Sequence, residues 1–245
     1  TYQLYKLKRG QNIIANTTYC NSPQEAQNKT KIGSVVNINV EKIYALKPDL
    51  IITSTLTRKN QIEKLQQLGL RVEIFHQVTD YDGIITQYKT LADYVNREEL
   101  AQKQLDSLKH EIKRVRKKII NKERKKVFFQ IGSNPLYAAN GSSFIDDMIN
   151  MANGQNVVQS NKTGAFSREA IIAKNPDFIF IALNGQKSKI EKKKWQKFTS
   201  IKAVRNNAIH ILDPDIFCTP TPFTFTQALQ KMAKLIYPNI NVSNE

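Results

Sequence analysis

The stretch Glu41-Lys-Ile-Tyr-Ala-Leu-Lys-Pro-Asp-Leu-Ile-Ile52 recurs 128 positions later as Glu169-Ala-Ile-Ile-Ala-Lys-Asn-Pro-Asp-Phe-Ile-Phe180, with six of the twelve positions identical. Each copy predicts a short helix that opens with an acid, where the helix dipole favours negative charge. A Lys/Asn-Pro-Asp corner then ends the helix, and an apolar strand typical of a buried parallel sheet follows. Because this spacing is too long for a solenoid repeat, it predicts two similar α/β lobes with a cleft between them.

Around the two copies, predicted strands alternate with predicted helices, a pattern typical of parallel α/β sheets. The expected organisation is a first lobe over 1–96, a joining helix over 97–124 and a second lobe over 125–245. The joining helix is predicted because apolar residues recur at steps of three or four. These residues are Leu105, Leu108, Ile112, Val115 and Ile119. A helical joint of this length is stiff, so we expect a small hinge closure.

The first ten residues read as the end of a helix that is closed by Gly10, because glycine favours the left-handed conformation at helix ends. A helix without a strand before it suggests that an upstream segment, including the first strand of the sheet, is missing. No stretch of 18 apolar residues occurs, so the sequence predicts no membrane-spanning helix.

The 245 residues carry a formal net charge of +16, with basic clusters at 109–126 and 187–197. The first cluster falls on the polar face of the predicted joining helix, so it is interpreted as a solvated, lysine-rich surface. No zinc-finger spacing, aromatic strand motif or helix-turn-helix pattern accompanies the charge, so nucleic acid is not expected as a partner. The remaining interpretation of the charge is attraction to anionic ligands or membrane surfaces.

No catalytic constellation is apparent, and neither an enzyme nor a bound cofactor is expected. The glycines form no phosphate-binding loop, and the three histidines lie on different predicted elements. His210 is expected to pack within a strand, and His110 to be exposed on the joining helix. His76 follows the strand that ends at Phe75, where open α/β sheets place ligand contacts, so it is a candidate pocket residue.

Cys20 and Cys218 lie in predicted loops that follow strands. They could be packing residues, a disulfide that spans the two lobes, or soft ligands to a metal or its complex. Aromatic side chains gather in the same loops and predict a wall for a flat or bulky apolar ligand. These aromatic residues are Tyr19, Tyr137, Phe166, Phe217 and Phe223.

An ordered set of motifs runs along the chain: Thr18-Tyr-Cys-Asn-Ser-Pro23, Gly33-Ser34, Asn39-Val-Glu-Lys-Ile-Tyr-Ala-Leu-Lys-Pro-Asp49, Gly132-Ser-Asn-Pro135, Ser143-Phe-Ile-Asp-Asp147, Gly154-Gln-Asn156, Ser167-Arg-Glu-Ala170 and Pro176-Asp177. With these motifs, the chain resembles the helical-backbone substrate-binding proteins of ABC importers, the class III periplasmic binding proteins that handle cobalamin, haem and ferric siderophores. The likeness is greatest to the vitamin B12-binding members. It implies two Rossmann-like lobes with parallel sheets joined by one long α-helix, a periplasmic or lipid-anchored extracytoplasmic protein, and a monomer.

The resemblance also implies roles for single residues. Glu41 and Glu169 stand where a glutamate on each lobe docks onto arginines of the membrane permease. Tyr19 and Tyr137 stand where the vitamin B12-binding members place aromatic residues of the cleft, and Asp215 matches an acid in their second-lobe loop.

The sequence departs from the vitamin B12-binding members at other positions. Val35 replaces one of the tryptophans that enclose the corrin, and Thr219 stands where an arginine is expected. The single tryptophan, Trp195, lies in a lysine-rich segment outside the expected cleft. The ligand class therefore stays open among cobalamin, other corrinoids, haem and ferric siderophores.

These observations predict a carrier that captures a metal chelate in the cleft and delivers it to an ABC permease. An alternative is a receptor for nickel or cobalt, or for a small complex of either, with Cys20, His76 and Cys218 as candidate ligands. An alternative of another class is a two-lobed α/β enzyme whose cofactor site is not visible in the sequence.

Overall fold

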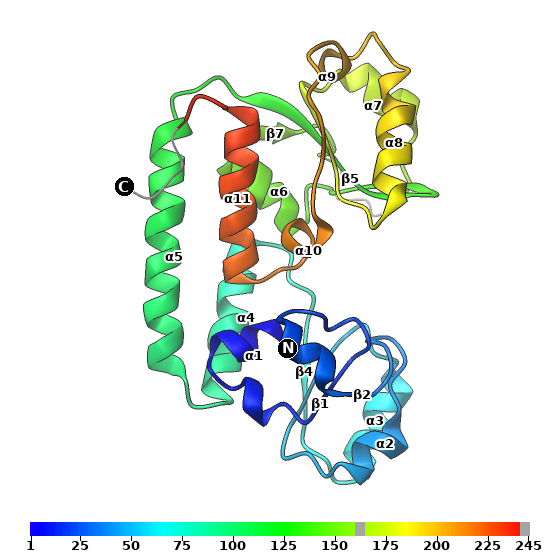
Figure 1. Ribbon diagram of the computed structural model, residues 1–245, viewed down its shortest axis with the longest axis vertical. Coiled ribbons are helices and arrows are strands. Elements are labelled where there is room, and N and C mark those ends of the chain that lie inside the picture. Colours follow the sequence, from blue (N-terminus) through cyan, green and yellow to red (C-terminus); the bar gives the residue numbers. More distant parts are fainter. Residues whose placement is uncertain (160–164, 241–245) are drawn as a thin grey trace. The chain divides into compact units, whose positions relative to one another are not determined.

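The computed structural model of the protein describes residues 1–159 and 165–240. The chain forms two compact units (Figure 1). Unit 1 comprises Thr1–Gln77 and Thr86–Gln102, and unit 2 comprises Val78–Ile85 together with 103–245. Two helices, α4 (Tyr81–Asp93) and α5 (Glu98–Ile119), contribute residues to both units. Helix α5 confirms the long helix that the spacing of apolar residues predicts.

The repeated sequence adopts the same local structure in both units. In unit 1 it forms α2 (Val40–Ala45) and β3 (Ile51–Ser54), and in unit 2 it forms α7 (Arg168–Lys174) and β8 (Phe178–Ile181). Each unit therefore contains the helix, the proline corner and the apolar strand that the sequence predicts.

The two copies also share their caps. The side chains of Asn39 and Ser167, again 128 positions apart, each accept the backbone N–H three residues on, which satisfies one of the free donors at a helix start. Lys47 and Asn175, which precede the two prolines, both have φ near 47°. The left-handed conformation of these two residues turns the chain from helix into strand in each copy.

The strands of unit 1 form two separate pairs, although the sequence suggests one sheet. Strands β1 and β2 pair in parallel, as do β3 and β4. A small core lies beneath α2 and is made of Ile38, Val40, Ile43 and Leu65. The other elements of unit 1 are α1 (Tyr2–Lys6), β1 (Ala15–Asn16), β2 (Thr30–Lys31), α3 (Lys59–Gln67) and β4 (Val72–Phe75), with short 3₁₀ turns at Gly10–Asn12 and Gln24–Asn28.

The predicted glycine cap at the end of α1 is wrong. The helix ends at Lys6, and Lys8 takes the left-handed conformation with φ 56°. The Lys8 N–H donates to Tyr5 O and the Arg9 N–H donates to Leu4 O, which is the hydrogen-bond pattern of a Schellman cap.

Unit 2 is built on a five-stranded sheet in the order β6-β5-β8-β9, with β7 pairing to the other end of β5. All pairings are parallel except that of β5 with β6. Its further elements are β5 (Lys125–Ser133), β6 (Leu136–Ala138), α6 (Phe144–Met151), β7 (Gly154–Asn156), α8 (Gln186–Gln196), α9 (Lys202–Arg205), β9 (Ile209–Ile211), α10 (Pro214–Phe217) and α11 (Pro222–Ile236).

Successive residues of the central strands bury opposite faces of this sheet. Phe129 and Phe180 pack into a core with side chains of α5, α6 and α11. Phe128 and Ile179, one position away on each strand, pack into a second core with side chains of α7, α8 and α9. Because both faces are covered, the strands read as continuous apolar runs, and the predicted fold class is confirmed.

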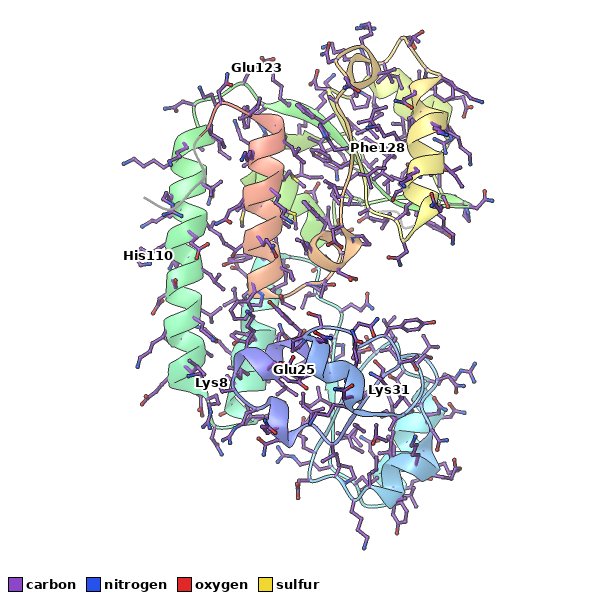
Figure 2. The ribbon with its side chains drawn as sticks, viewed as in Figure 1. Lys8, Glu25, Lys31, His110, Glu123 and Phe128 are labelled. Carbon is purple, nitrogen blue, oxygen red and sulfur yellow. The ribbon has the colours of Figure 1, made fainter. Side chains whose placement is uncertain are left out.

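Two histidine predictions agree with the structure. His110 is exposed on α5 (Figure 2). His210 lies on β9 with its ring 6.2 Å from Phe178 and 5.8 Å from Phe180, and burial lowers the pKa of its imidazole, with Lys192 adding to the effect.

Candidate functional site

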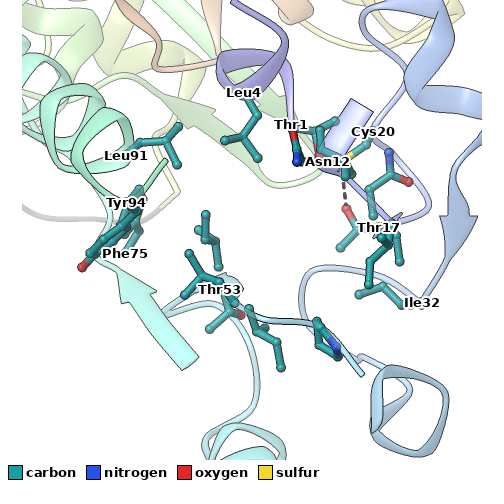
Figure 3. A pocket seen from close by; sticks show the side chains of 18 of the residues that line it. Thr1, Leu4, Asn12, Thr17, Cys20, Ile32, Thr53, Phe75, Leu91 and Tyr94 are labelled. Carbon is teal, nitrogen blue, oxygen red and sulfur yellow. Dashed lines mark hydrogen bonds between the residues drawn. The ribbon is translucent and has the colours of Figure 1, made fainter. Parts of the chain in front are cut away.

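Unit 1 contains a cavity of about 690 Å³ (Figure 3). Its walls come from the strands β1 and β3, from the loops that follow them, and from the end of α4. Most of the lining side chains are apolar or aromatic, and Phe75, Leu91 and Tyr94 lie together on one side (Figure 3).

One wall of the cavity is a strand edge. The Ile51 N–H donates to Arg71 O, and the Thr55 N–H donates to Phe75 O. Because hydrogen-bonding direction alternates along a parallel strand, Ile52 and Ser54 turn their peptide groups away from β4, toward the edge that lines the cavity. No strand of the described residues pairs with that edge. The cavity is therefore a gap between the two strand pairs of unit 1.

Two predicted site residues, Cys20 and Val35, line this cavity. The Cys20 Sγ accepts a hydrogen bond from Thr1 Oγ1 at 3.1 Å and lies 3.2 Å from Thr17 Oγ1. Burial acts to raise the pKa of the Cys20 thiol, but these hydrogen bonds outweigh it and hold the pKa below its ordinary value.

Two other candidates in unit 1 are not among the residues that line the cavity. Tyr19 is 80% exposed, and the side chain of His76 is also exposed. The backbone carbonyl of His76 accepts a hydrogen bond from Gln87 Nε2 at 2.9 Å. Cys20 and Val35 therefore line the same cavity, whereas Tyr19 and His76 lie at the surface of unit 1.

In unit 2, Tyr137 and Phe166 are neighbours. Tyr137 lies on β6 and forms a bridge with Ala165, and the Phe166 N–H donates to Leu136 O at 2.9 Å. Tyr137 is partly exposed, and Phe166 packs against the core beneath α7 and α8. A strand pairing between β6 and the segment before α7 therefore brings these two predicted residues together.

The remaining candidates of unit 2 lie on or next to α10. Asp215 is exposed, and its N–H donates to Asp213 Oδ1, which caps the helix. Phe217 is only 2% exposed, and its ring lies 6.2 Å from that of Phe129. Burial raises the pKa of the Cys218 thiol to about 11, and Asp213 and Asp215 add to the effect. Within this short segment, Asp215 faces solvent whereas Phe217 belongs to the core.

The two cysteines are free thiols. Within residues 1–159 and 165–240, no three His, Cys, Asp or Glu side chains gather as they would to hold a metal ion.

The two repeated acids occupy equivalent positions but differ in their partners. Glu41 lies in the first turn of α2, with 79% of its side chain exposed, and accepts a hydrogen bond from Lys64 Nζ at 3.1 Å. This hydrogen bond lowers the pKa of the Glu41 carboxyl. Glu169 lies exposed in the first turn of α7. Both carboxylates are presented to solvent at a helix start.

A buried polar network next to Glu169 was not predicted from the sequence. Glu191 of α8 is 1% exposed and accepts hydrogen bonds from Arg168, from Lys194 at 2.8 Å and from Gln130 at 2.8 Å. Trp195 donates from Nε1 to the buried Gln130 Oε1 at 2.8 Å, and the Arg168 guanidinium lies 4.5 Å from the centre of its ring. The only sequence signal is a glutamate and a tryptophan four residues apart in a lysine-rich helix.

Comparisons with known proteins give the family. The family model described as periplasmic binding protein matches residues 1–216. An ABC transporter substrate-binding lipoprotein of Bacillus subtilis is 27% identical over 96% of this chain and 76% of its own length. A vitamin B12-binding protein of Vibrio campbellii is 24% identical over 90% of this chain and 80% of its own length. A periplasmic haem-binding protein of Vibrio cholerae has the same fold, with a TM-score of 0.85, 19% identity and coverage of 96% and 95% of the two chains.

Among the described helices, none combines the length and the apolar character that a membrane crossing requires. Extracytoplasmic location follows from the family and from the lipoprotein relative. Three findings lead to one assignment: the family match over most of the chain, the repeated helix–corner–strand segment and the shared fold. The chain belongs to the periplasmic binding protein family, and it is a non-enzymatic substrate-binding component of an ABC transporter.

Proposed function

We propose that this protein captures a metal chelate of the corrinoid, haem or ferric siderophore class and delivers it to a membrane permease. The observation that carries the proposal is the family match over residues 1–216. Relatives named for vitamin B12 and haem binding share its sequence pattern or fold, and both of those ligands are metal chelates.

A chelate suits the side chains better than a bare ion does. The candidate residues are mainly aromatic, apolar or thiol groups, and the described residues contain no cluster of metal-ligating side chains. Flat or bulky complexes bind through enclosed apolar contact with a few polar groups that set their orientation. We assign Cys20 and Val35 of unit 1, and Tyr137 and Asp215 of unit 2, as candidate contacts.

Four further residues keep the roles proposed from the sequence, and the role of a fifth, Phe217, changes. The exposed side chains of Tyr19 and His76 are available to a ligand. Phe166 stands beside Tyr137, and the half-buried Cys218 follows Phe217 on α10. Because Phe217 is buried against Phe129, we assign it a supporting role beneath the candidate contacts.

The two acidic helix starts are the proposed docking points for the permease. Glu41 and Glu169 are exposed and 128 positions apart, and the residues around them share caps and backbone conformation. Paired carboxylates in matching local structures suit a permease that presents an arginine to each of them. Close charge pairs across protein interfaces couple by about 1.5–7 kcal/mol, so each contact can contribute materially to docking.

The ligand class is tested by thermal unfolding of the purified protein with cyanocobalamin, haem, a ferric hydroxamate siderophore, and nickel and cobalt salts. A ligand present at about 100 times its dissociation constant adds about 2.7 kcal/mol of stability. Stabilisation by one chelate and by neither salt supports the proposal. Stabilisation by a salt alone contradicts it, and so does conversion of any compound to a released product.

A further inference from the structure

Helix α8 carries five lysines and a single acid in eleven residues. The lysines surround the exposed side of the helix and are called here the α8 basic face: Lys187, Lys189, Lys192, Lys193 and Lys194. The acid, Glu191, is buried and already holds Arg168 and Lys194. Apart from Lys194, which pairs with Glu191, the lysines of the α8 basic face have no carboxylate of this helix as a partner.

The orientation of this helix is held by its buried side. Ser188 donates from Oγ to Leu183 O at 2.8 Å, Glu191 accepts from Gln130, and Trp195 donates to the other end of the same Gln130 amide. These three residues follow one another at steps of three and four and form one stripe. Because all three are tied to the body of unit 2, the α8 basic face is directed toward solvent.

Helix stability does not explain this arrangement. Lys189 has like-charged neighbours three and four residues on, at Lys192 and Lys193, and such pairs destabilise an isolated helix by about 0.2–0.5 kcal/mol each. In the part of the chain that the structure describes, neither Lys187 nor these three forms an ion pair with a carboxylate. Helix α5 differs, because it carries four acids, of which Asp106 and Glu111 lie among its cations.

An apolar side chain accompanies the lysines. Ile190 is 52% exposed and lies between Lys189 and Glu191 in the sequence of α8. Lysines near a membrane surface are attracted to anionic headgroups, and the exposed Ile190 can add an apolar contact beside them. The one aromatic residue of α8, Trp195, is buried, so the helix offers no stacking platform for nucleic acid bases.

We propose that the α8 basic face binds the anionic phospholipid headgroups of the membrane that contains the permease. The proposal rests on the proposed function in one respect. Arg168 directly precedes the docking residue Glu169, and its guanidinium binds Glu191 of α8. Docking through Glu169 therefore brings α8 close to the surface in which the permease is embedded. Attraction to that surface concentrates the loaded carrier beside its transporter.

The test measures binding to vesicles of phosphatidylglycerol in phosphatidylcholine, with pure phosphatidylcholine vesicles as the blank. The variant is K187Q/K189Q/K193Q on α8. The matched control, K109Q/K113Q/K117Q, removes the same charge from exposed positions on α5. Each lysine near an anionic surface contributes about 1 kcal/mol, or about fivefold in affinity. The α8 variant is expected to bind roughly a hundredfold more weakly, and the α5 control to stay within about tenfold of the unaltered protein.

Equal loss in the two variants would show that total charge alone drives adsorption, and would overturn the proposal. Absence of binding to the anionic vesicles would do the same, as would an equal or greater affinity for duplex DNA at matched phosphate concentration. Emission from the buried Trp195 reports whether α8 keeps its place in each variant. The substitution Glu169→Gln separates permease docking from lipid binding. If docking is lost and vesicle binding is retained, the lipid-binding inference stands. If docking is retained, only the docking role of Glu169 is contradicted.

Discussion

Replacing Glu191 by glutamine should destabilise unit 2 strongly, although the substitution preserves size and shape. The carboxylate is 1% exposed and pairs with Arg168 and Lys194. Removal of one partner of a buried ion pair costs about 3–5 kcal/mol because the other charge is left without compensation. Here the Arg168 side chain is 19% exposed and the Lys194 side chain is 48% exposed. Water therefore screens part of the positive charge that the substitution leaves without a partner. We therefore expect a loss of about 2–3 kcal/mol.

The assay uses the single tryptophan of the chain. Trp195 is fully buried and bonded to Gln130 beside Glu191, so its fluorescence reports unfolding of unit 2 alone. In urea, with a slope of about 2 kcal/mol per molar, the predicted loss moves the midpoint down by about 1–1.5 M. The control is Lys194→Ala, which removes a half-exposed partner of the same carboxylate and should cost less than about 1 kcal/mol.

The pH dependence gives a second measurement. Burial acts to raise the pKa of the Glu191 carboxyl, but the hydrogen bonds from Gln130, Lys194 and Arg168 outweigh it and lower the pKa below its ordinary value of 4.5. A group with a lowered pKa stabilises the fold above its unfolded value, and that stability is lost as the pH falls through the folded value. Glu191→Gln should remove this part of the acid sensitivity. A loss below about 1 kcal/mol, or an unchanged slope between about pH 3 and 6, would refute the reasoning.

Three further predictions concern unit 1 and the thiols. Cys20 should react with iodoacetamide much faster than Cys218 between pH 7 and 9, because its thiol pKa is lowered while that of Cys218 is raised to about 11; equal rates, followed by peptide mass spectrometry, would contradict the assignment. Lys64→Gln frees Glu41 from an exposed ion pair worth at most about 1 kcal/mol. Permease binding should therefore tighten by up to about fivefold at low salt. Weaker binding would contradict docking through Glu41. Leu65→Ala should cost about 2–5 kcal/mol, because Leu65 is fully buried in the small core of unit 1; calorimetry that shows less than about 1 kcal/mol would contradict this packing.

Patterns among residues that are close together in the sequence were sufficient to predict much of the secondary structure of this protein. The repeat predicted the helix, corner and strand of each unit, and the structure adds that even the caps and the left-handed residues recur at the same spacing. The regular apolar steps predicted α5, which runs from Glu98 to Ile119 within the expected range of 97–124. These features depend on backbone preferences and on the periodicity of apolar residues, and both can be read from a short segment of sequence.

Only the tertiary structure decided which distant residues meet. Helix α8 escaped prediction because its buried stripe is Ser188, Glu191 and Trp195, which is polar except for one residue and acquires partners only when Gln130 and Arg168 arrive from other elements. The cavity of unit 1 likewise depends on which strand edges are paired, and Phe217 belongs to a core although its loop suggested a ligand wall. Pairing and burial of this kind arise from contacts between segments far apart in the chain, and no local pattern encodes them.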